Sequence, residues 1–299
     1  MPQWDAEIEV DQALARALIE NRYPQLEAES LKLLGSGWDN TVWVTKDGIA
    51  FRFPRREIAL DGIRQEIALL PEIAPRLPCR VPDASYPGAP SELFPWPWFG
   101  SHVIKGREIA GSQLDENARG ELAADLGTFL RCLHGLSVPQ IDGLPADPTG
   151  RADMTIRVPR TRTALDELDA SGALTSRAAD VLTTADTLPA ADGFVLAHGD
   201  LHIRHVLVDE AGRLSGVIDW GDACYAPAAV DLSLYWSLFG PAARGGFRAT
   251  YGNVSDATLL RARVLALFLN ATLAVYARDQ GMGALESEAL DGVERTLTG

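Results

Sequence analysis

The chain has 299 residues, 46% of them hydrophobic, and a formal net charge of −14 at pH 7. This length allows one large domain or two ordinary ones, and the apolar content is enough for a core without metal or disulfide support. The negative charge repels nucleic-acid phosphates and anionic lipid, so it argues against nucleic-acid and membrane partners and favours a cationic ligand.

Two further features indicate a cytoplasmic protein, which we expect to be a monomer. The N-terminus, MPQWDAEIEV, lacks the basic start and apolar stretch of a signal peptide, and no apolar run approaches the roughly 20 residues of a membrane span. Cys79, Cys132 and Cys224 are far apart and form no CxxC pair. The pattern therefore predicts reduced thiols rather than a disulfide framework or a zinc site.

The first third of the chain predicts a small sheet with helices. Residues 7–22 have apolar side chains at helical spacing, which predicts a first helix. In 31–54 the hydrophobic period changes to two, so we expect strand, glycine turn, strand, hairpin turn and strand. A helix over 63–73 contains Glu66, and the stretch 86–108, rich in proline and aromatic residues, predicts strands and a connector.

The rest of the chain has mainly helical patterns. We expect helices at 116–136, two within 161–187, one at 231–239, and one at 259–281 that is apolar nearly all round and therefore central to a second core. The predicted fold is α+β. An N-terminal lobe (1–100) is built on a small antiparallel sheet, a connector spans 101–108, and a larger, mainly helical lobe spans 109–299.

The most informative stretch runs from His198 to Trp220, HGDLHIRHVLVDEAGRLSGVIDW. Short apolar runs flank a polar segment with Gly212, which predicts a β-hairpin. A turn centred on Gly212 places His205 opposite Asp219, and opposed side chains have Cβ atoms about 4.5–5.5 Å apart. The two side chains are thus expected to share one small cation, with Asp200 held beside the same site by the preceding loop.

The two carboxylates suit phosphoryl transfer. Asp219 is a hard oxygen ligand of the kind that Mg²⁺ shares with nucleotide phosphates. Asp200 can orient an acceptor hydroxyl and take its proton. In the alternative interpretation, HGD is a capping turn and IDW ends a core strand with a surface carboxylate.

The combination of motifs resembles the aminoglycoside phosphotransferase family, relatives of protein kinases that phosphorylate small molecules. The glycine turn GSGWDN, the strand AFRFPRR, the helical Glu66, the connector GSHVIKGRE, HGDLxxxH and IDW occur in the family order over most of the chain. The HGDLxxxHVLVD and SGVIDW pair is also similar to macrolide phosphotransferases, in which a His replaces the usual Asn. The resemblance implies a protein-kinase-like fold with two lobes.

The resemblance also implies a role for each matched residue of the loop. Asp200 would be the catalytic base, Asp219 the principal metal ligand, and His205 a second metal ligand or a residue that orders the loop. His198 would be structural. Asp231 would support the loop from the following helix or, alternatively, cap that helix.

Nucleotide binding is expected from the first lobe. Backbone N–H groups of Gly35-Ser36-Gly37 can approach phosphates, although the same residues also suit a plain hairpin turn, which here continues into Trp38. Arg52 occupies the position of the family's lysine and would pair with Glu66, keeping the charge but with a larger, planar head. Backbone groups of the connector would meet the purine of ATP or GTP; these residues are Ser101, His102, Val103 and Ile104.

On the acceptor side, Asp222 could meet an amine, or be a solvated loop carboxylate. Asp166, Glu167 and Asp169 could line a cleft for a polycation, although exposed helix faces carry such charges as well. The expected activity is Mg²⁺- and nucleotide-dependent O-phosphorylation of a small amine-bearing molecule, most simply an aminoglycoside-type antibiotic, and hence antibiotic resistance.

Three alternatives remain open at this point. The first is a macrolide 2'-phosphotransferase. The second is a metabolic small-molecule kinase acting on choline, homoserine or a sugar, since a resemblance of fold does not transfer substrate. The third is a nucleotide-binding pseudokinase, because Arg52 and His205 depart from the family's usual residues.

Overall fold

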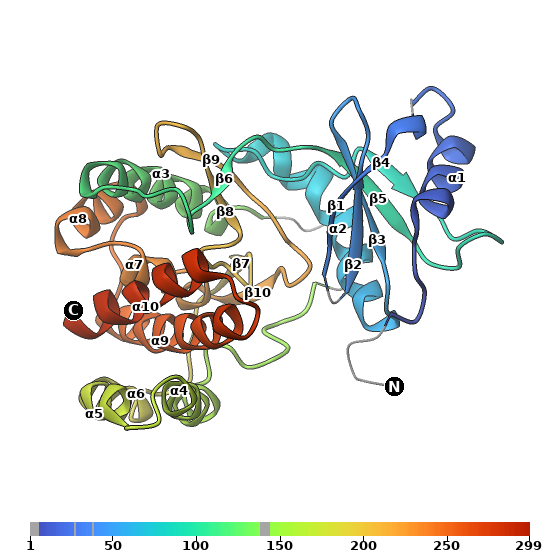
Figure 1. Cartoon of the computed structure of the whole chain (residues 1–299). Helices are drawn as coiled ribbons and strands as arrows, with labels where there is room; N and C mark the ends of the chain where they lie inside the picture. Colours follow the sequence, from blue (N-terminus) through green and yellow to red (C-terminus); the bar gives the residue numbers. More distant parts are fainter. Residues whose placement is uncertain (1–5, 27, 38, 138–143) are drawn as a thin grey trace. The chain divides into compact units, whose positions relative to one another are not determined.

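The computed structural model of the chain describes residues 6–26, 28–37, 39–137 and 144–299. Backbone contacts divide the chain into two units (Figure 1). The N-terminal unit comprises Met1–Arg76 and Arg80–Ile104, and the C-terminal unit comprises Leu77–Cys79 and Lys105–Gly299. The first unit is built on an antiparallel sheet and the second is mainly helical, so the predicted α+β class is confirmed.

The sheet of the N-terminal unit has the strand order β1-β2-β3-β5-β4, and neighbouring strands are antiparallel. Its strands are β1 (Lys32–Ser36), β2 (Asn40–Val44), β3 (Ile49–Pro54), β4 (Tyr86–Gly88) and β5 (Trp98–His102). In β3, Phe51 and Phe53 are buried whereas Arg52 between them is partly exposed. The period of two therefore directs Arg52 to the face away from the aromatic core.

The helices of this unit are α1 (Gln12–Arg22) and α2 (Leu60–Ile73), with 3₁₀ turns η1 (Ala28–Ser30), η2 (Glu57–Ala59) and η3 (Ala74–Arg76). The first helix begins after Asp11 rather than at the predicted residue 7, because the Asp11 side chain accepts a hydrogen bond from Leu14 N and caps it. Buried residues of α1, among them Leu18 and Ile19, share a core with Phe51 and Trp98 of the sheet.

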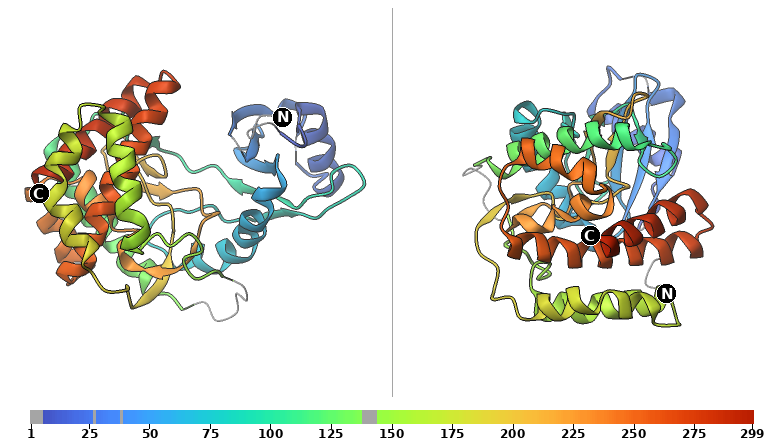
Figure 2. Two further views of the ribbon diagram at one scale, coloured as in Figure 1. Left: turned by 90° about the horizontal axis from the view of Figure 1, so that it is seen from below. Right: turned by 90° about the vertical axis from the view of Figure 1, so that its left-hand side faces the viewer.

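The C-terminal unit is arranged in helical layers. Its helices are α3 (Glu116–His134), α4 (Met154–Leu168), α5 (Ala173–Arg177), α6 (Ala179–Asp186), α7 (Ser233–Ser237), α8 (Pro241–Tyr251), α9 (Asp256–Asp279) and α10 (Gly283–Thr298), with η4 (Ala228–Val230) before α7. Helix α8 packs on α3, α10 runs along α9, and α4 and α6 contact α9 (Figure 2). The two helices predicted within 161–187 are three, and the first begins earlier because Asp153 caps it.

Helix α9 corrects one expectation. By length and composition alone it could span a membrane, since its most apolar stretch has a mean hydropathy of 1.5. The prediction that no apolar run approaches the length of a membrane span was therefore wrong. However, 56% of that stretch is buried, and the helix contacts α4, α7 and α10. This confirms the prediction that it is central to the second core.

Short strands of the C-terminal unit form two small sheets. β6 (Arg107–Glu108), β8 (Val206–Val208) and β9 (Leu214–Val217) form one, and β7 (Phe194–Ala197) pairs with β10 (Cys224–Pro227) in the other. The predicted hairpin forms as β8 and β9, but the predicted register was wrong by one residue. Ile218, not Asp219, lies opposite His205, because Ile218 N donates to His205 O at 2.9 Å.

The physical reason for the shift is the turn. Asp209 N donates to Arg213 O at 3.0 Å, so the turn is centred on Ala211 rather than on Gly212. The turn alone would shift the partner of His205 by two residues, and a register irregularity between Leu207 and Val208 reduces this shift to one. A slip of one residue normally turns a side chain to the other face of a strand, so another feature must bring Asp219 to His205.

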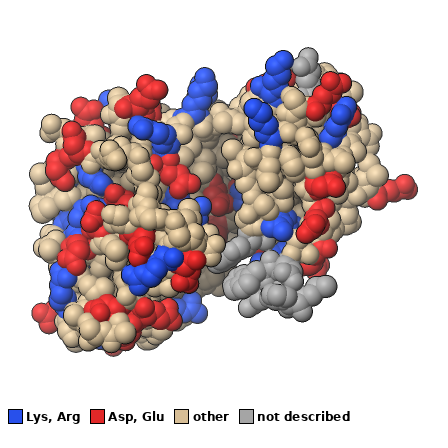
Figure 3. All heavy atoms as spheres, viewed as in Figure 1, with Lys and Arg blue, Asp and Glu red and all other residues tan. Residues whose placement is uncertain are grey.

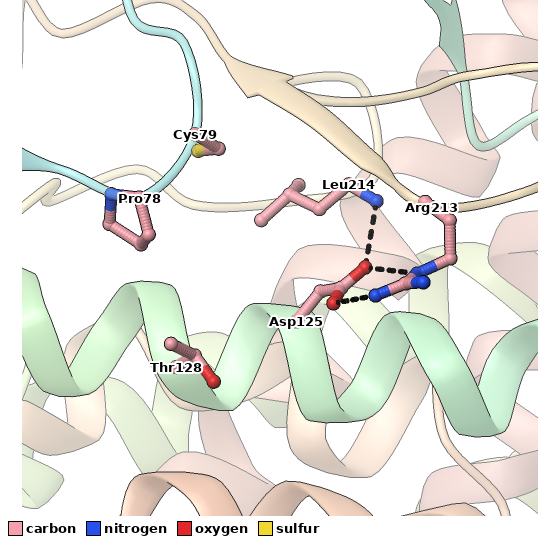
Figure 4. A pocket seen from close by; sticks show the side chains of 6 residues that line it. All are labelled: Pro78, Cys79, Asp125, Thr128, Arg213 and Leu214. Atoms are coloured by element: carbon pink, nitrogen blue, oxygen red, sulfur yellow. Dashed lines mark hydrogen bonds and ion pairs between the residues drawn. The ribbon is translucent and has the colours of Figure 1, made fainter.

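The segment Leu77–Cys79 belongs to the C-terminal unit although the residues on both sides of it belong to the N-terminal one. With α3 and the start of β9 it lines a cavity of about 310 Å³ (Figure 4). Asp125 accepts hydrogen bonds there from Arg213 Nε and Nη2, at 2.7 and 2.6 Å, and from Leu214 N at 3.2 Å. Burial and then the charge of Asp125 raise the pKa of the Cys79 thiol to about 12, so it is a neutral thiol.

Candidate active site

A buried carboxylate holds the loop that follows β7. Asp231 accepts hydrogen bonds from His198 N at 2.7 Å and Gly199 N at 3.0 Å, and its Oδ2 lies 3.2 Å from His134 Nε2. Burial by itself raises the pKa of Asp231, but the hydrogen bonds and charges of His134 and His198 outweigh it and hold the pKa below its ordinary value. Asp231 is therefore ionised, and it binds the backbone of the loop rather than capping a helix N-terminus.

The first two residues of HGD are structural. The ring of His198 is fully buried, its Nε2 donates to Ile218 O at 3.0 Å, and its Nδ1 accepts from Asp200 N at 3.3 Å. Gly199 has a φ of +88°, and a Cβ there would collide with the backbone oxygen of Asp222. The turn thus requires glycine, and it fixes the position from which the Asp200 side chain projects.

The imidazoles of His198, which is buried, and His202, which is 12% exposed, predict a stability that falls in mild acid. Burial, and then the neighbouring His205, lower the pKa of His198 below 6.5 and that of His202 well below 6.5. The unfolded chain therefore binds protons that the folded chain excludes. This stability is full above about pH 6.5 and is lost as the pH falls below it.

We expect calorimetry to show a Tm that decreases from about pH 7.5 to about pH 5.5. The variant His102→Gln, which removes an exposed imidazole, is the control and should keep nearly the same slope. A constant Tm over this range would show that the imidazoles of His198 and His202 do not remain neutral in the folded chain.

Asp200, His205 and Asp219 lie together in the C-terminal unit. Asp219 has a φ of +67°, a left-handed conformation that aspartate tolerates better than most residues. Its Oδ2 lies 3.4 Å from His205 Nε2. On the other side, His205 Nδ1 lies 2.7 Å from Asp200 O and 3.9 Å from Asp200 Oδ2. The left-handed conformation of Asp219 thus brings its carboxylate close to His205. The sequence predicted this proximity, but from an incorrect strand register.

His202 is a member of the site that the sequence analysis missed. Ligand-type atoms of Asp200, His202 and His205 all lie within 4.8 Å of one another, and the imidazole rings of His202 and His205 are tilted by 31° with centroids 3.8 Å apart. His202 Nδ1 accepts from Arg204 N at 3.3 Å, so the proton of its neutral ring is on Nε2. That N–H lies 3.6 Å from Asp200 Oδ2. His202 therefore presents a donor, not a lone pair, to the carboxylate.

The tautomer of His205 is the opposite one. Because Asp200 O is a carbonyl, His205 Nδ1 donates to it, so in the neutral ring the lone pair is on Nε2, which faces Asp219. Adjacent ligands of an octahedral Mg²⁺, with bonds of about 2.0–2.1 Å, are about 3 Å apart. The 3.4 Å between His205 Nε2 and Asp219 Oδ2 fits two ligands of one cation. Of His202 and His205, only His205 is oriented as a ligand.

Three of the four acidic residues expected at the acceptor, all but the exposed Glu167, form ion pairs or hydrogen bonds within the chain. Asp222 forms an ion pair with Arg151. Asp166 accepts from Thr175 Oγ1 at 2.6 Å, and Asp169 accepts from Ser171 N at 3.0 Å and so forms the turn before α5. Acidic side chains are interspersed with basic ones on the face shown in Figure 3. The net negative charge is not gathered into one patch on that face.

In the N-terminal unit, Arg52 and Glu66 form an ion pair with Nη1 and Oε1 3.0 Å apart. The Glu66 side chain is 1% exposed and that of Arg52 is 21% exposed. With the Asn40 amide oxygen turned towards Arg52, it accepts from Nη2 at 2.9 Å and Nε at 3.1 Å. The guanidinium is thus fixed between a buried carboxylate and an amide on the neighbouring strand.

The glycine turn has an unexpected cation beside it. Arg55 Nη1 donates to Ser36 Oγ at 2.8 Å and to Gly37 O at 2.7 Å. A Cβ at Gly35 would meet nothing within 4 Å, and Gly35 has no positive φ, so the fold does not require glycine there. The next residue, Trp38, lies outside the described residues.

The expected connector 101–108 starts later than predicted. Ser101 and His102 are the last residues of β5, where they pair with Ala50 and Ile49. Val103 N donates to Gly48 O at 2.8 Å. The chain therefore continues the sheet pairing as far as Val103, and Ile104 is the last residue of the N-terminal unit.

Comparison with solved structures identifies the fold. The GDP and kanamycin complex of APH(2")-IIia has a TM-score of 0.70 and 21% sequence identity, covering 94% of this chain and 97% of that chain. The macrolide 2'-phosphotransferase MphH from Brachybacterium faecium has a TM-score of 0.64 and 22% identity, covering 95% of this chain and 97% of that one. At these identities the likeness concerns the fold alone.

Sequence comparison adds a short and a long match. The uncharacterized protein YcbJ of Bacillus subtilis (strain 168) is 49% identical over 45 residues, which span 15% of this chain and 15% of that relative. A family model covers far more, matching residues 30–265 and thus the glycine turn, Arg52, Glu66, the catalytic-type loop and Asp219. The chain therefore belongs to the phosphotransferase enzyme family (APH).

Proposed function

We propose that the protein is a small-molecule O-phosphotransferase that transfers the γ-phosphoryl group of ATP or GTP to a hydroxyl of a small amine-bearing molecule of the aminoglycoside type. The convergence of Asp200, His205 and Asp219 carries the proposal, because phosphoryl transfer needs a proton acceptor beside a metal-binding pair. Related folds occur in complexes with GDP and kanamycin and with ATP and streptomycin. We further propose that it acts as a cytoplasmic monomer.

In the proposed mechanism, Asp200 orients the acceptor hydroxyl and takes its proton as the phosphoryl group is transferred. His202 steadies the carboxylate by presenting Nε2–H to Oδ2, and the hydrogen bond from His205 Nδ1 fixes the backbone of Asp200. Asp231 holds the start of the loop through two backbone N–H groups. These contacts restrict where the carboxylate can lie, which is the main contribution that a protein makes to this chemistry.

Asp219 and His205 would hold the Mg²⁺. When bound, the ion neutralises charge on the nucleotide phosphates. An oxygen and an imidazole nitrogen are together less selective for Mg²⁺ than two oxygens, and they also suit Mn²⁺. Arg52, held by Glu66, is proposed as the cation for the nucleotide phosphates, and the backbone of Gly35-Ser36-Gly37 as a phosphate contact.

The variant His205→Asn is expected to keep Mg²⁺-supported activity, because the amide supplies an oxygen ligand in place of the imidazole. His205→Ala should lose that activity, since it removes both the ligand and the hydrogen bond to Asp200 O. The measurement is turnover against Mg²⁺ concentration for both variants and the wild type. Equal metal dependence of the two variants would show that His205 does not contact the metal.

Neutralising Arg52 should weaken nucleotide binding by about tenfold or more, as expected for loss of a phosphate-binding charge. Because a lone Arg52→Met change would leave Glu66 buried without this partner, the double variant Arg52→Met/Glu66→Leu keeps the core neutral. Arg52→Lys should bind nearly as wild type. Binding of Mg·ATP and Mg·GTP is measured by calorimetry, with the exposed Arg64→Met as control. Wild-type affinity in the double variant would exclude Arg52 from the nucleotide site.

A macrolide acceptor is the second candidate. The observation in its favour is that Asp222 is paired with Arg151, while Asp166 and Asp169 form local hydrogen bonds, so free carboxylates for a polycation are few among these residues. A macrolide needs a large apolar pocket instead. An Asp222→Asn variant with a higher KM for an aminoglycoside would favour the first candidate.

The deciding experiment is a panel of acceptors incubated with ATP and GTP in parallel and read by a mass gain of one phosphate. The panel contains aminoglycosides, macrolides, choline, homoserine and simple sugars. Phosphorylation of one class assigns the acceptor. Nucleotide binding with no product and no acceptor-dependent ADP or GDP release would instead identify a pseudokinase.

A further inference from the structure

The glycine turn between β1 and β2 is an exposed part of the N-terminal unit. All residues of β1 and the following Gly37 are exposed. A Cβ added to Gly37 would have one neighbouring atom within 4 Å, Asn40 O at 3.9 Å. A backbone hydrogen bond from Gly37 N to Asn40 O, at 2.9 Å, closes the turn. Because close packing does not hold these residues, their conformation depends on polar contacts.

Arg55, directly after β3, contacts the chain before and after this turn. Its Nη1 donates to Ser36 Oγ at 2.8 Å and to Gly37 O at 2.7 Å. Its backbone N donates to Asp39 O at 2.7 Å. Its own carbonyl accepts from the backbone N–H groups of residues 7–8, at 2.9 and 3.1 Å. Arg55 therefore connects the turn to β3 and to the segment before α1.

The charge of Arg55 is used differently from that of its neighbours. Arg52 forms an ion pair with Glu66, and Arg56 forms one with Asp39. Within the described residues, Arg55 has no carboxylate partner, and its buried Nε has no acceptor in the structure. An arginine is always charged in proteins, so its hydrogen bonds to neutral oxygens are charge-assisted. The polar contacts of this guanidinium are thus with the glycine turn.

The strand pairing shows on which face of the sheet this contact lies. Ser36 pairs with Thr41, and Thr41 pairs with Phe53 of β3. Directly opposed side chains lie on the same face, so the Ser36 side chain lies on the face that carries the buried Phe53. Arg52, the residue before Phe53, lies on the other face. Arg55 therefore reaches the turn from the face opposite to Arg52, the cation proposed for the nucleotide phosphates.

We propose that Arg55 is a positioning residue for the nucleotide, which holds the glycine turn from behind so that its backbone N–H groups meet the phosphates. The inference rests on the proposed function, because it requires that the turn binds phosphate. A segment that is already held in its bound conformation loses less conformational entropy on binding, which raises affinity. The gain is limited to ligands whose phosphates reach the turn, and a nucleoside does not share it.

The test compares Arg55→Met and Arg55→Lys with the exposed Arg64→Met as charge-matched control. Hydrogen exchange in peptides that cover residues 32–37, without ligand, should be faster in Arg55→Met and unchanged in Arg64→Met. Calorimetry should show about three- to tenfold weaker binding of Mg·ATP or Mg·GTP by Arg55→Met. Displacement by adenosine or guanosine should give wild-type affinity for the nucleoside. Arg55→Lys should recover part of the nucleotide affinity, because an ammonium group can still donate to the turn.

A second variant separates positioning from direct contact with phosphate. Ser36→Ala keeps the backbone of the turn and removes one acceptor of Arg55. It should therefore weaken nucleotide binding less than Arg55→Met does, and should have no further effect in the Arg55→Met background. If Arg55→Met weakened nucleotide binding while Ser36→Ala and the exchange of the turn stayed as in the wild type, Arg55 would contact the phosphates directly, and the proposal would be overturned.

Two further outcomes separate this inference from the proposed function. A wild type that binds nucleotide, with unchanged affinity and unchanged exchange of the turn in Arg55→Met, would contradict the role of Arg55 alone. A wild type that binds neither nucleotide would contradict the proposed function and, with it, the role of Arg55.

Discussion

The Asp200→Asn variant is expected to lose phosphoryl transfer by about 10²–10⁴-fold while the protein stays folded and still binds nucleotide. The amide has the size of the carboxylate but cannot accept the proton of an acceptor hydroxyl. Asp200 is also in a favourable place for this role. The N–H of His202 lies 3.6 Å from its Oδ2, and the hydrogen bond from His205 holds its backbone oxygen.

The measurement combines single-turnover transfer with calorimetric nucleotide binding. The Glu210→Gln variant removes one exposed carboxylate from the turn between β8 and β9 and is the charge-matched control. It should transfer phosphate at the wild-type rate. If Asp200→Asn retained near-normal turnover, Asp200 would have no part in the mechanism, and the proposed base would have to be sought elsewhere.

The hairpin shows which part of the site could be read from the sequence. The apolar runs on either side of Gly212 predicted β8 and β9, because strand pairing follows local pattern. The register could not be predicted, since it depends on the bond between Asp209 N and Arg213 O that closes the turn. The contact between His205 and Asp219 arises instead from the left-handed φ of Asp219, for which the sequence has only a weak signal.

Other features depend on residues far apart in the chain. The role of His202 depends on which of its ring nitrogens carries the proton, and the backbone N–H of Arg204 determines that. The position of His202 in the sequence, between Asp200 and His205, was therefore not sufficient to predict its role. The pair of Asp222 with Arg151 joins positions 71 residues apart and leaves no local pattern. By contrast, the Arg52–Glu66 pair was predicted, because a family motif specifies both members, and the two atoms lie 3.0 Å apart.

Helix α8 was missed for a related reason. It contains Gly245 and Gly246, and two glycines lower intrinsic helix propensity. Packing against α3 overrides that propensity, and the packing is close enough that a Cβ at Gly127 would collide with Thr250. Tertiary contacts with α3 thus stabilise α8 as a helix. Such contacts cannot be predicted from a single sequence until the surface of the partner helix is known.

The second large effect is expected for Asp231→Ala, which should destabilise the C-terminal unit by about 3–5 kcal/mol. The carboxylate is fully buried, and its removal leaves the N–H groups of His198 and Gly199 without acceptors and His134 Nε2 without its hydrogen-bond partner. A change of this size lowers the Tm by about 10 °C. The exposed Asp186→Ala, at the end of α6, is the control and should leave the Tm almost unchanged.

The pH dependence of the same group separates its ionic contribution from simple packing. Because the pKa of folded Asp231 lies below its ordinary 3.8, the stabilisation by its charge is present above about pH 4 and disappears as the pH falls through the lower, folded value. The difference in Tm between wild type and Asp231→Ala should therefore be constant from neutral pH to about pH 5 and shrink below it. If the difference in Tm does not change down to the acid limit of folding, Asp231 stabilises the fold by packing and hydrogen bonding, and its charge does not contribute.

Loss of transfer activity in Asp231→Ala well below its Tm, with nucleotide still bound, would in turn show that the buried carboxylate positions the loop carrying Asp200.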